Sequence, residues 1–578
     1  MNLNFVYLNN IKVRSRLILN ELKICLSAFT IFVRRYELNR INEMKKILFA
    51  IIAVVWVISG QAQQQRNPFL GMQADPEQVA ASQKLMQFVN YLGATYVDTL
   101  SLGPLVDAAI VEMLSKLDPH SAYVSAEEMK SVQESFNANF EGIGIEFNVL
   151  NDTIIVVNTI PGGPSEKVGL LPNDRIVTVG GANVVGTKQM DVPKILRGPK
   201  GSVIDVGIVR QGVLQEQTFR IERDKIPIYT VDASYKVNER TGYVRVNRFA
   251  ATTNRELQEA IMSMGAIDAL ILDLRGNGGG FLDQAVYVSN TFLPKGSLVV
   301  STEGLRMPAE KLEAPQNPSF GRGKVIILVD EYSASASEIV SGAVQDWDRG
   351  LVIGRPTFGK GLVQRQFPLI DGSAVRITVA RYHTPTGRVI QRPYEKGKTE
   401  EYYLKFSERF TADSLQAFPD SLKYQTLRSG RTVYGGGGIT PDILVTRDTT
   451  WYSDYWARLR GKGVINEFVI DYMDKNRASL ERDYADFDAF YRGFAVEQPM
   501  LDALVQLGEK RGVPYAEEGM QKSKGQIGVQ LKALIAQKMW TMTEYFQVVN
   551  READDFFAKA MEVLDHWDDY SQGIRDGR

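Results

Sequence analysis

The sequence predicts a multidomain α/β protein in which helical regions flank a small β domain and an α/β core. Apolar residues recur at helical spacing in residues 76–138 and again beyond Thr446. Between these regions, short strand patterns are followed by apolar runs that alternate with amphipathic helices, as in βαβ units. The 578 residues are enough for about three or four domains.

The composition of the chain argues against several classes of function. The net charge of −1 argues against broad nucleic-acid binding. Cys25 is the only cysteine, so we expect neither disulfides nor a thiolate metal site in the body of the chain. The three histidines show no H-E-x-x-H spacing, which makes a zinc protease unlikely on sequence grounds. We therefore predict no metal and no cofactor.

The N-terminal part has the pattern of an export signal. From Met44, two lysines precede the apolar run Ile47 to Ile58, and a small-x-small site ends at Ala62. This pattern predicts a secretory signal peptide over residues 44–62. Residues 1–43 are basic and asparagine-rich, so we expect them to be a spurious upstream extension. The body is then expected in a periplasm or outside the cell, with an uncleaved membrane anchor as the alternative.

Residues 63–139 form the predicted N-terminal helical region. A D-P-H-S sequence, residues 118–121, breaks its second helix. His120 could in principle serve a Ser–His site, but a histidine in a helix-ending turn is more typical of capping or packing.

Residues 140–225 change to short strands separated by a glycine turn and a short helix. This order resembles a PDZ domain. PDZ domains add a peptide as an extra strand and hold its terminal carboxylate on backbone N–H groups of a glycine loop. The resemblance places that loop at Gly142, Ile143, Gly144 and Ile145. The alternative is that these glycines only form a bulge or turn.

Residues 324–364 contain the candidate catalytic residues. An apolar strand pattern ends in a loop with Ser333, Ser335 and Ser337; a helix and a second strand follow, and then Lys360 between two glycines. Loops at neighbouring strand ends meet in a parallel sheet. A neutral lysine can activate a serine, and burial favours the neutral form. The simpler interpretation is that Ser335 caps the helix in an S-x-x-E capping box.

A P-loop is the rival interpretation of the second loop. Residues 354–360 match its pattern, but Gly361 replaces the hydroxyl residue that would bind Mg²⁺. A P-loop must also open a helix, whereas residues 362–380 have the pattern of a β-hairpin. Nucleotide binding is therefore rejected.

The S-A-S-A-S-E-I sequence, followed by F-G-K-G and V-Q, resembles the carboxyl-terminal processing peptidases, tail-specific S41 serine proteases. The resemblance covers about Gln78 to Asp442. It implies that Ser335 is the nucleophile, that Lys360 is the base 25 residues later, and that Gln364 orients the lysine. It also implies an oxyanion hole built from the backbone N–H of Ala336 and of Gly278 or Gly279.

The resemblance places the protease core at residues 226–445 and leaves residues 446–578 as a helical extension. Within the core we expect a βαβ unit over residues 243–273, a surface loop over residues 306–322, and a structural His383. Residues of the extension mark one apolar helix face, for which packing is the favoured role and a homodimer surface the alternative; they are Ile527, Leu531, Leu534, Ile535, Met539, Met542 and Tyr545.

These observations predict an exported serine endopeptidase with a Ser–Lys dyad that recognises the free C-termini of protein or peptide substrates through its PDZ domain. Two alternatives keep the same fold. One is a PDZ-bearing adaptor with a silent site, and the other is a general protease for unfolded proteins that its PDZ domain gates.

Overall fold

The computed structural model describes residues 75–150, 152–210, 213, 215–408 and 420–571. The expected signal peptide and the residues before it lie outside this part of the chain. The chain divides into two compact units, residues 1–102 and 103–578. In the first unit, Asp75 caps helix α3 (Pro76–Thr95) by accepting a hydrogen bond from the N–H of Glu77. Among the described residues, no helix has both the length and the apolarity needed to cross a bilayer.

The small β domain forms one antiparallel sheet in the order β3-β4-β5-β7-β8, with β6 paired to β5. Its elements are β3 (Ile145–Leu150), β4 (Thr153–Thr159), α6 (Pro164–Lys167), β5 (Arg175–Val179), β6 (Ala182–Asn183), α7 (Val192–Leu196), β7 (Val203–Val209) and β8 (Gln217–Glu222). Apolar side chains from alternate strand positions, among them Ile154, Ile176 and Val206, are fully buried in its core. The predicted order of strands, glycine turn and short helix is confirmed.

A two-stranded ribbon connects the small β domain to the rest of the second unit. Strand β2 (Asn139–Gly142) leads into the domain and pairs antiparallel with β9 (Asp224–Pro227), which leads out of it. Helix α5 (Ala126–Asn137) precedes the ribbon and begins with a capping box between Ser125 and Glu128.

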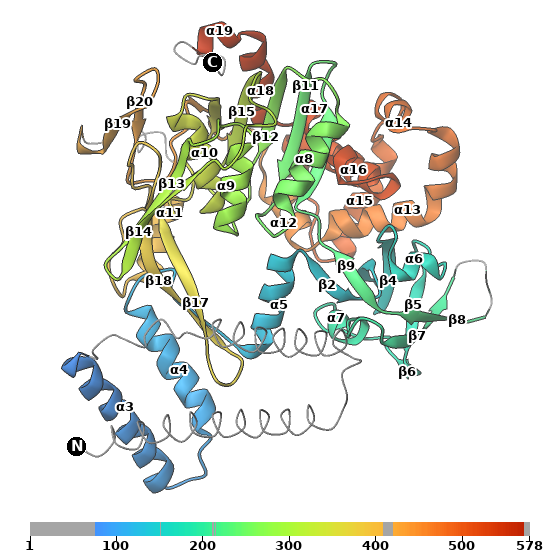
Figure 1. The fold of residues 1–578 in the computed structure, drawn as a ribbon. Coiled ribbons are helices and arrows are strands. Elements are labelled where there is room, and N and C mark those ends of the chain that lie inside the picture. The colour runs from blue at the N-terminus through green and yellow to red at the C-terminus, as the bar shows by residue number, and fades with distance from the viewer. Residues whose placement is uncertain (1–74, 151, 211–212, 214, 409–419, 572–578) are drawn as a thin grey trace, which may run out of the picture. The chain divides into compact units, whose positions relative to one another are not determined.

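The core is built on a mostly parallel sheet in the order β10-β11-β12-β15-β16-β21 (Figure 1). Its strands are β10 (Val231–Lys236), β11 (Thr241–Val246), β12 (Ala269–Asp273), β15 (Lys324–Val329), β16 (Leu351–Gly354) and β21 (Ile443–Leu444). Helix α8 (Thr253–Ser263) connects the parallel strands β11 and β12, which confirms the predicted βαβ unit. Because β15 and β16 are parallel neighbours, the loops that follow them open at the same edge of the sheet.

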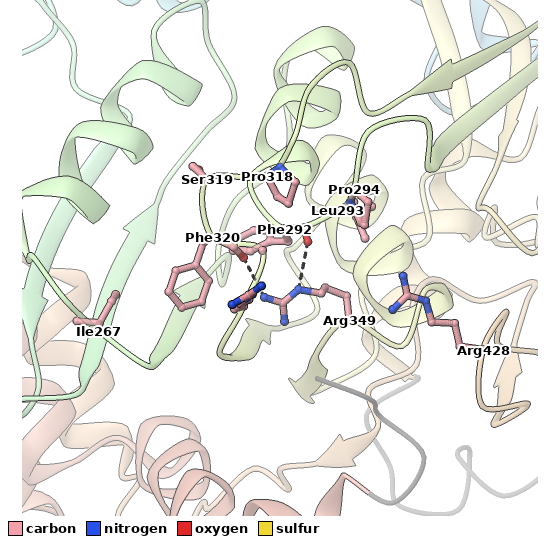
Figure 2. A pocket seen from close by; sticks show the side chains of 11 residues that line it. Ile267, Phe292, Leu293, Pro294, Pro318, Ser319, Phe320, Arg349 and Arg428 are labelled. Atoms are coloured by element: carbon pink, nitrogen blue, oxygen red, sulfur yellow. Dashed lines mark hydrogen bonds between the residues drawn. The ribbon is translucent and has the colours of Figure 1, made fainter. Parts of the chain in front are cut away.

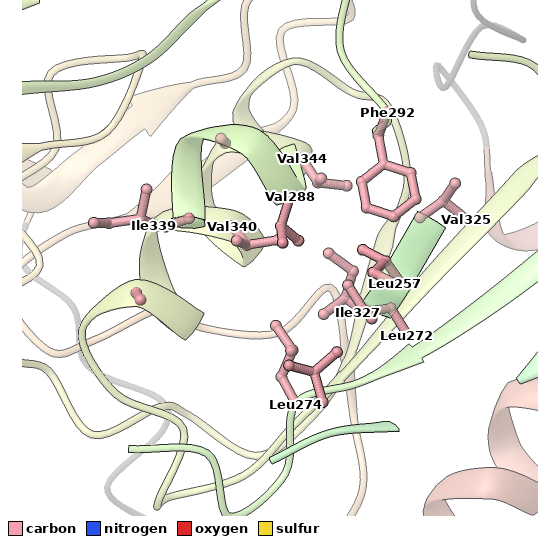
Figure 3. Close-up of a cluster of buried hydrophobic side chains, with 14 of the residues drawn as sticks. Leu257, Leu272, Leu274, Val288, Phe292, Val325, Ile327, Ile339, Val340 and Val344 are labelled. Atoms are coloured by element: carbon pink, nitrogen blue, oxygen red, sulfur yellow. The ribbon is translucent and has the colours of Figure 1, made fainter. Parts of the chain in front are cut away.

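Helices cover both faces of this sheet. On one face, α8, α9 (Leu282–Asn290) and α10 (Ala336–Asp346) bury Leu272, Val325 and Ile327 (Figure 3). On the other face, the alternate strand residues pack against α18 (Asp555–Asp565) near the end of the chain. The C-terminal extension therefore contributes α18 to the α/β core and also forms a region of its own.

A second sheet lies next to the core helices, with the order β1-β18-β13-β14 and β17 paired to β18. Its strands are β1 (Ala122–Val124), β13 (Leu298–Gly304), β14 (Met307–Glu313), β17 (Leu362–Pro368) and β18 (Ala374–His383). The β17–β18 pair is the predicted hairpin, and it excludes the helix that a P-loop requires. The expected surface loop over residues 306–322 is wrong for its first half, which forms β14. As an edge strand with most side chains exposed, β14 has no apolar alternation by which the sequence could indicate it.

The C-terminal extension is helical, as expected. Its helices before α18 are α12 (Asp454–Gly461), α13 (Val464–Asp483), α14 (Phe487–Gly493), α15 (Gln498–Lys510), α16 (Glu517–Met539) and α17 (Met542–Glu552). On α16, Ile527, Leu531 and Ile535 are fully buried in the core of this bundle. The packing interpretation of this apolar face is therefore confirmed for these residues.

Candidate active site

Ser335 lies at the start of α10, in the loop that follows β15. Its φ of 55° and ψ of −112° place a non-glycine residue in a region that side chains rarely adopt. Such strain persists only where the surrounding structure holds it, and it concentrates at functional sites. A serine on a sharp turn between a strand and a helix is the arrangement that exposes a nucleophile at the edge of an α/β sheet.

Glu338, in the first turn of α10, connects the Ser335 loop to the loop that contains Lys360. Its Oε2 accepts hydrogen bonds from the backbone N–H groups of Ser335 (2.8 Å) and Lys360 (2.9 Å). Its Oε1 accepts from the N–H of Gly359 (2.7 Å) and the hydroxyl of Thr357 (2.6 Å). The Glu338 half of the predicted capping box is present, since its carboxylate accepts from the N–H of Ser335, and this carboxylate also binds the second loop. Burial raises the pKa of Glu338 to about 7, against these hydrogen bonds.

Tyr382 of β18 holds the same two loops from the other side. Its hydroxyl donates to the backbone oxygen of Lys360 and lies 3.3 Å from the backbone oxygen of Ser335. The backbones on either side of the site are therefore joined through both their N–H and their C=O groups.

Lys360 lies in a largely buried position beside glycines, as the sequence predicted. Burial and then the positive charge of Arg376 lower the pKa of its amino group, while Glu338 and Asp118 act in the opposite direction. The net effect favours the neutral amine, which is the form that can accept a proton.

One cavity of about 710 Å³ brings the predicted site residues together. Ser335, Ala336, Lys360 and Gln364 line it, together with the glycines of residues 278–280. The remaining lining comes mainly from α5, α10 and the β17–β18 hairpin. The predicted catalytic and oxyanion residues, which span 86 positions of the sequence from Gly278 to Gln364, therefore share one space.

The two candidate oxyanion glycines differ in what their N–H groups do. The N–H of Gly279 donates to the side-chain oxygen of Asn277 at 2.9 Å. Within the described part of the chain, no hydrogen bond is recorded from the N–H of Gly278 or of Ala336. A Cβ atom at Gly279, where φ is 98°, would lie 2.9 Å from the nitrogen of Ala336. Gly279 thus allows the close approach of the two loops, and Gly278 keeps its donor.

Gln364 contacts Lys360's surroundings rather than its amino group. Its amide nitrogen lies 3.2 Å from the oxygen of Leu362 and 3.4 Å from the hydroxyl of Thr378. The Thr378 hydroxyl in turn donates to Asp118 at 3.0 Å. Sequence reasoning did not select Asp118, although the D-P-H-S turn that contains it was noticed for its histidine.

The two candidate histidines occupy different surroundings. His120 lies near Lys360, and its ring packs against Phe358 and Tyr402. Burial and then the charge of Lys360 lower its pKa to about 4, so it is neutral near pH 7. His383 contacts the oxygen of Gly387 and does not line the cavity. Both placements agree with the structural roles that the sequence favoured.

The predicted peptide-binding loop, residues 142–145, joins β2 to β3. Ile143 is buried, and its backbone oxygen accepts hydrogen bonds from the N–H and hydroxyl of Ser165. A Cβ atom at Gly144, where φ is 76°, would lie 2.9 Å from Ile226. Strand β3 ends the sheet order, so among the described strands its outer edge is unpaired and could receive a peptide strand.

Comparisons with known proteins agree with this architecture. Family models match for peptidase family S41 at residues 240–399, for a PDZ domain at residues 142–221, and for a family of unknown function, DUF8443, at residues 455–541.

Among curated relatives, a carboxy-terminal-processing protease of Bartonella bacilliformis is 39% identical over 50% of this chain and 67% of its own. The carboxy-terminal processing protease CtpA of Bacillus subtilis is 35% identical over 55% of this chain and 69% of its own. Among solved structures, the photosystem II D1 C-terminal processing protease is 27% identical over 64% of this chain and 87% of its own, with a TM-score of 0.33.

Proposed function

The chain belongs to peptidase family S41, among the carboxy-terminal processing proteases, and contains a PDZ domain. From this premise we propose that it is a serine endopeptidase that uses a Ser335–Lys360 dyad to cleave exported proteins selected by their C-terminal tails. The observation that supports the dyad most strongly is the shared cavity, in which a strained serine and a buried lysine lie beside unused backbone donors.

In the proposed reaction, neutral Lys360 takes the hydroxyl proton of Ser335 while Oγ attacks the scissile carbonyl carbon. The carbonyl oxygen becomes an oxyanion, which the N–H groups of Gly278 and Ala336 stabilise. Lys360 then gives its proton to the leaving amine, and the C–N bond breaks to form an acyl-enzyme. Water, deprotonated by Lys360, attacks the ester, and Ser335 recovers its proton as the new carboxyl group leaves.

Gln364 is proposed to position Lys360 indirectly. Gln364 contacts Thr378, and the Thr378 hydroxyl donates a hydrogen bond to Asp118. This chain of contacts would order the side of the cavity next to the Lys360 amine. Asp118 also opposes the fall in the pKa of Lys360. A change at Gln364 should therefore lower kcat more than it raises KM.

The PDZ domain is proposed to select substrates by their free C-termini. Support comes from the edge of β3, which no described strand pairs with, and from the adjoining loop at residues 142–145; both have the placement that strand addition requires. Tail binding would hold a substrate close to the protease and raise its effective concentration there.

Export is proposed from the sequence of residues 44–62 alone. The cysteine-free body suits an oxidising compartment such as a periplasm or the cell exterior. Retention of this segment would leave the enzyme at the membrane surface. Microscopy or fractionation of a tagged chain, followed by N-terminal sequencing, distinguishes cleavage after Ala62 from anchoring.

The function is tested with purified wild type, Ser335→Ala and Lys360→Ala and an unstructured peptide that has a free apolar C-terminus. We expect cleavage by wild type alone, with a rate that rises with pH as Lys360 loses its proton. Equal cleavage by Lys360→Ala, or a flat pH profile, would contradict the dyad. Tight binding without cleavage by any of the three would favour the adaptor.

An amidated copy of the same peptide tests the role of the tail. We expect slower cleavage of the amidated peptide because the PDZ loop has no carboxylate to bind. Equal rates for the two peptides would favour a general protease for unfolded proteins.

A further inference from the structure

The cavity at Ser335 contains a second positively charged residue, Arg376 of β18. In the β17–β18 pairing, Gln366 is opposite Arg376 and Gln364 is opposite Thr378. Side chains of directly paired residues lie on the same face of a hairpin. Gln364, Gln366 and Arg376 therefore form a polar wall of the cavity that also contains Ser335 and Lys360.

The charge of this cavity is one-sided. Among the described residues that line it, Lys360 and Arg376 are the charged ones, and none is an aspartate or a glutamate. Burial lowers the pKa of Lys360, whereas a guanidinium is not deprotonated in proteins, so Arg376 supplies the permanent charge. A cavity that is lined by cationic side chains and by no carboxylate attracts an anionic group.

Arg376 is also poorly satisfied by the protein. Its Nε lies 3.5 Å from the side-chain oxygen of Gln366. Within the described part of the chain, its Nη2 is buried without a hydrogen-bond partner, and no acidic side chain forms an ion pair with it. Because the protein satisfies this guanidinium poorly, Arg376 has donor capacity left for an acceptor that a ligand brings into the cavity.

Another cavity of about 600 Å³ contains an arginine with a different role (Figure 2). The guanidinium of Arg349 donates to the backbone oxygens of Phe292, Gly323 and Phe320 at 3.1, 3.0 and 2.9 Å. The guanidinium of Arg349 therefore holds these backbone segments together. Arg349 thus has a structural role, because its donors bind backbone oxygens of the fold. No comparable set of partners accounts for Arg376 among the described residues.

We propose that Arg376 forms a carboxylate-binding subsite next to the scissile bond, so that the protease prefers substrates with a carboxylate there. The planar fork of a guanidinium matches the two oxygens of a carboxylate, and its charge strengthens both hydrogen bonds. This inference rests on the proposed function. The carboxylate comes either from an aspartate or glutamate side chain of the substrate or from its C-terminus.

The test compares matched peptides that have glutamate or glutamine at each position around one cleavage site. Wild type should cleave the glutamate peptide about tenfold faster in kcat/KM at one position, since a hydrogen bond to a charged group has about this effect. In Arg376→Gln this preference should disappear while the glutamine peptide is still cleaved. If the C-terminus supplies the carboxylate, free and amidated ends of short peptides will give the preference instead.

Arg365→Gln is the matched control. Arg365 lies on β17 between Gln364 and Gln366, so its side chain alternates to the other face of the hairpin. This variant should keep the preference of wild type. Equal cleavage of all acid and amide pairs by wild type, or a preference that persists in Arg376→Gln, would overturn the proposal. Arg376→Lys should retain part of the preference.

Binding to catalytically inactive Ser335→Ala separates this inference from the proposed function. The acid-to-amide ratio of peptide affinities is measured for Ser335→Ala with and without Arg376→Gln. Any contribution of the PDZ domain is common to both proteins and cancels. A ratio that falls about tenfold on loss of Arg376 supports the subsite whether or not turnover is detected, and an unchanged ratio contradicts it.

Discussion

The two loops of the candidate active site and the PDZ domain are attached to the molecule by different kinds of contact. The loops of Ser335 and Lys360 are joined through the buried carboxylate of Glu338 and the buried hydroxyl of Tyr382. Every residue of α10, which begins at the first loop, is buried. A shift of either loop would leave buried polar groups without partners, which is costly.

The PDZ domain is attached by contacts that are closer to water. The β2–β9 ribbon joins it to the core, and ion pairs connect Arg197 to Glu134 and Arg175 to Asp474. The side chains of Arg197 and Arg175 are 38% and 37% exposed. Ion pairs of this kind contribute about 0–1 kcal/mol each.

This difference indicates a division of roles. The loops of Ser335 and Lys360 are held in one geometry, which suits the electrostatic stabilisation of a transition state in the proposed reaction. The contacts of the PDZ domain are more exposed, so we expect a change in its position to cost less than a shift of either loop. The predictions below test this contrast, beginning with the largest expected effect.

Truncation in the two hydrophobic cores should have separable effects. Ile327 is fully buried between the sheet and its helices, and Val206 is fully buried in the PDZ domain. Ile327→Ala should destabilise the core by about 4 kcal/mol. On warming, this variant should lose the reaction of Ser335 with a small phosphonylating reagent at a lower temperature than wild type. Val206→Ala should lower only a PDZ transition in calorimetry and leave that reaction unchanged. A single merged transition in both variants would argue against independent attachment.

Glu338→Gln should damage catalysis more than folding. A glutamine amide has one acceptor oxygen, so either the Ser335 and Lys360 N–H groups or the Gly359 and Thr357 donors lose their acceptor. We expect kcat to fall about a hundredfold, because displacement of a catalytic group by about 1 Å has this effect. Steady-state kinetics on one peptide measure it.

The pH profile of Glu338→Gln distinguishes loss of geometry from loss of charge. The negative charge of Glu338 raises the pKa of Lys360, so its removal should move the rising limb of residual activity to lower pH. An unchanged limb would mean that Glu338 acts through geometry alone. Thr357→Val is the matched control, since it removes one hydrogen bond to Glu338 and retains the carboxyl group.

Glu338 and His120 should give opposite pH dependences of stability. Burial raises the pKa of Glu338 from 4.5 to about 7, so its contribution is lost as the pH rises through about 7. Burial and the Lys360 charge lower the pKa of His120 from 6.5 to about 4, so its contribution is present above 6.5 and lost as the pH falls toward 4.

In wild type these contributions oppose each other, and single variants should separate them. Between pH 5 and 6, Glu338→Gln should become more stable with rising pH, and His120→Asn less stable, by up to about 1.4 kcal/mol per pH unit. Urea unfolding at several pH values gives the slopes. Parallel profiles for the two variants would contradict the assignments.

Arg175→Ala should have the smallest effect. It removes the ion pair with Asp474 of α13, and we expect a loss of global stability below about 1 kcal/mol. Hydrogen exchange at the boundary between the PDZ domain and α13 should nevertheless increase, with exchange in α10 unchanged. If exchange in α10 also increases, the PDZ domain is coupled to the catalytic loops.

Much of the fold and the candidate site could be predicted because the signals are local. The apolar runs of β12 and β15, the amphipathic pattern of α8 and the glycines of residues 278–280 each follow from a short stretch of sequence. Strand β14 was missed because its exposed side chains have no apolar alternation. Asp118 was passed over because its partner Thr378 lies 260 residues away.

The sequence by itself determined which groups are available for chemistry: a serine before a helix, a lysine between glycines, and a PDZ-like module before them. Only the tertiary structure decided which of these groups are satisfied. It assigned the N–H of Gly279 to Asn277 and left that of Gly278 unused, made Glu338 a link between two loops, and left Arg376 without an acidic partner in the described chain. Hydrogen bonding and burial depend on residues that are distant in sequence, so no local pattern encodes them.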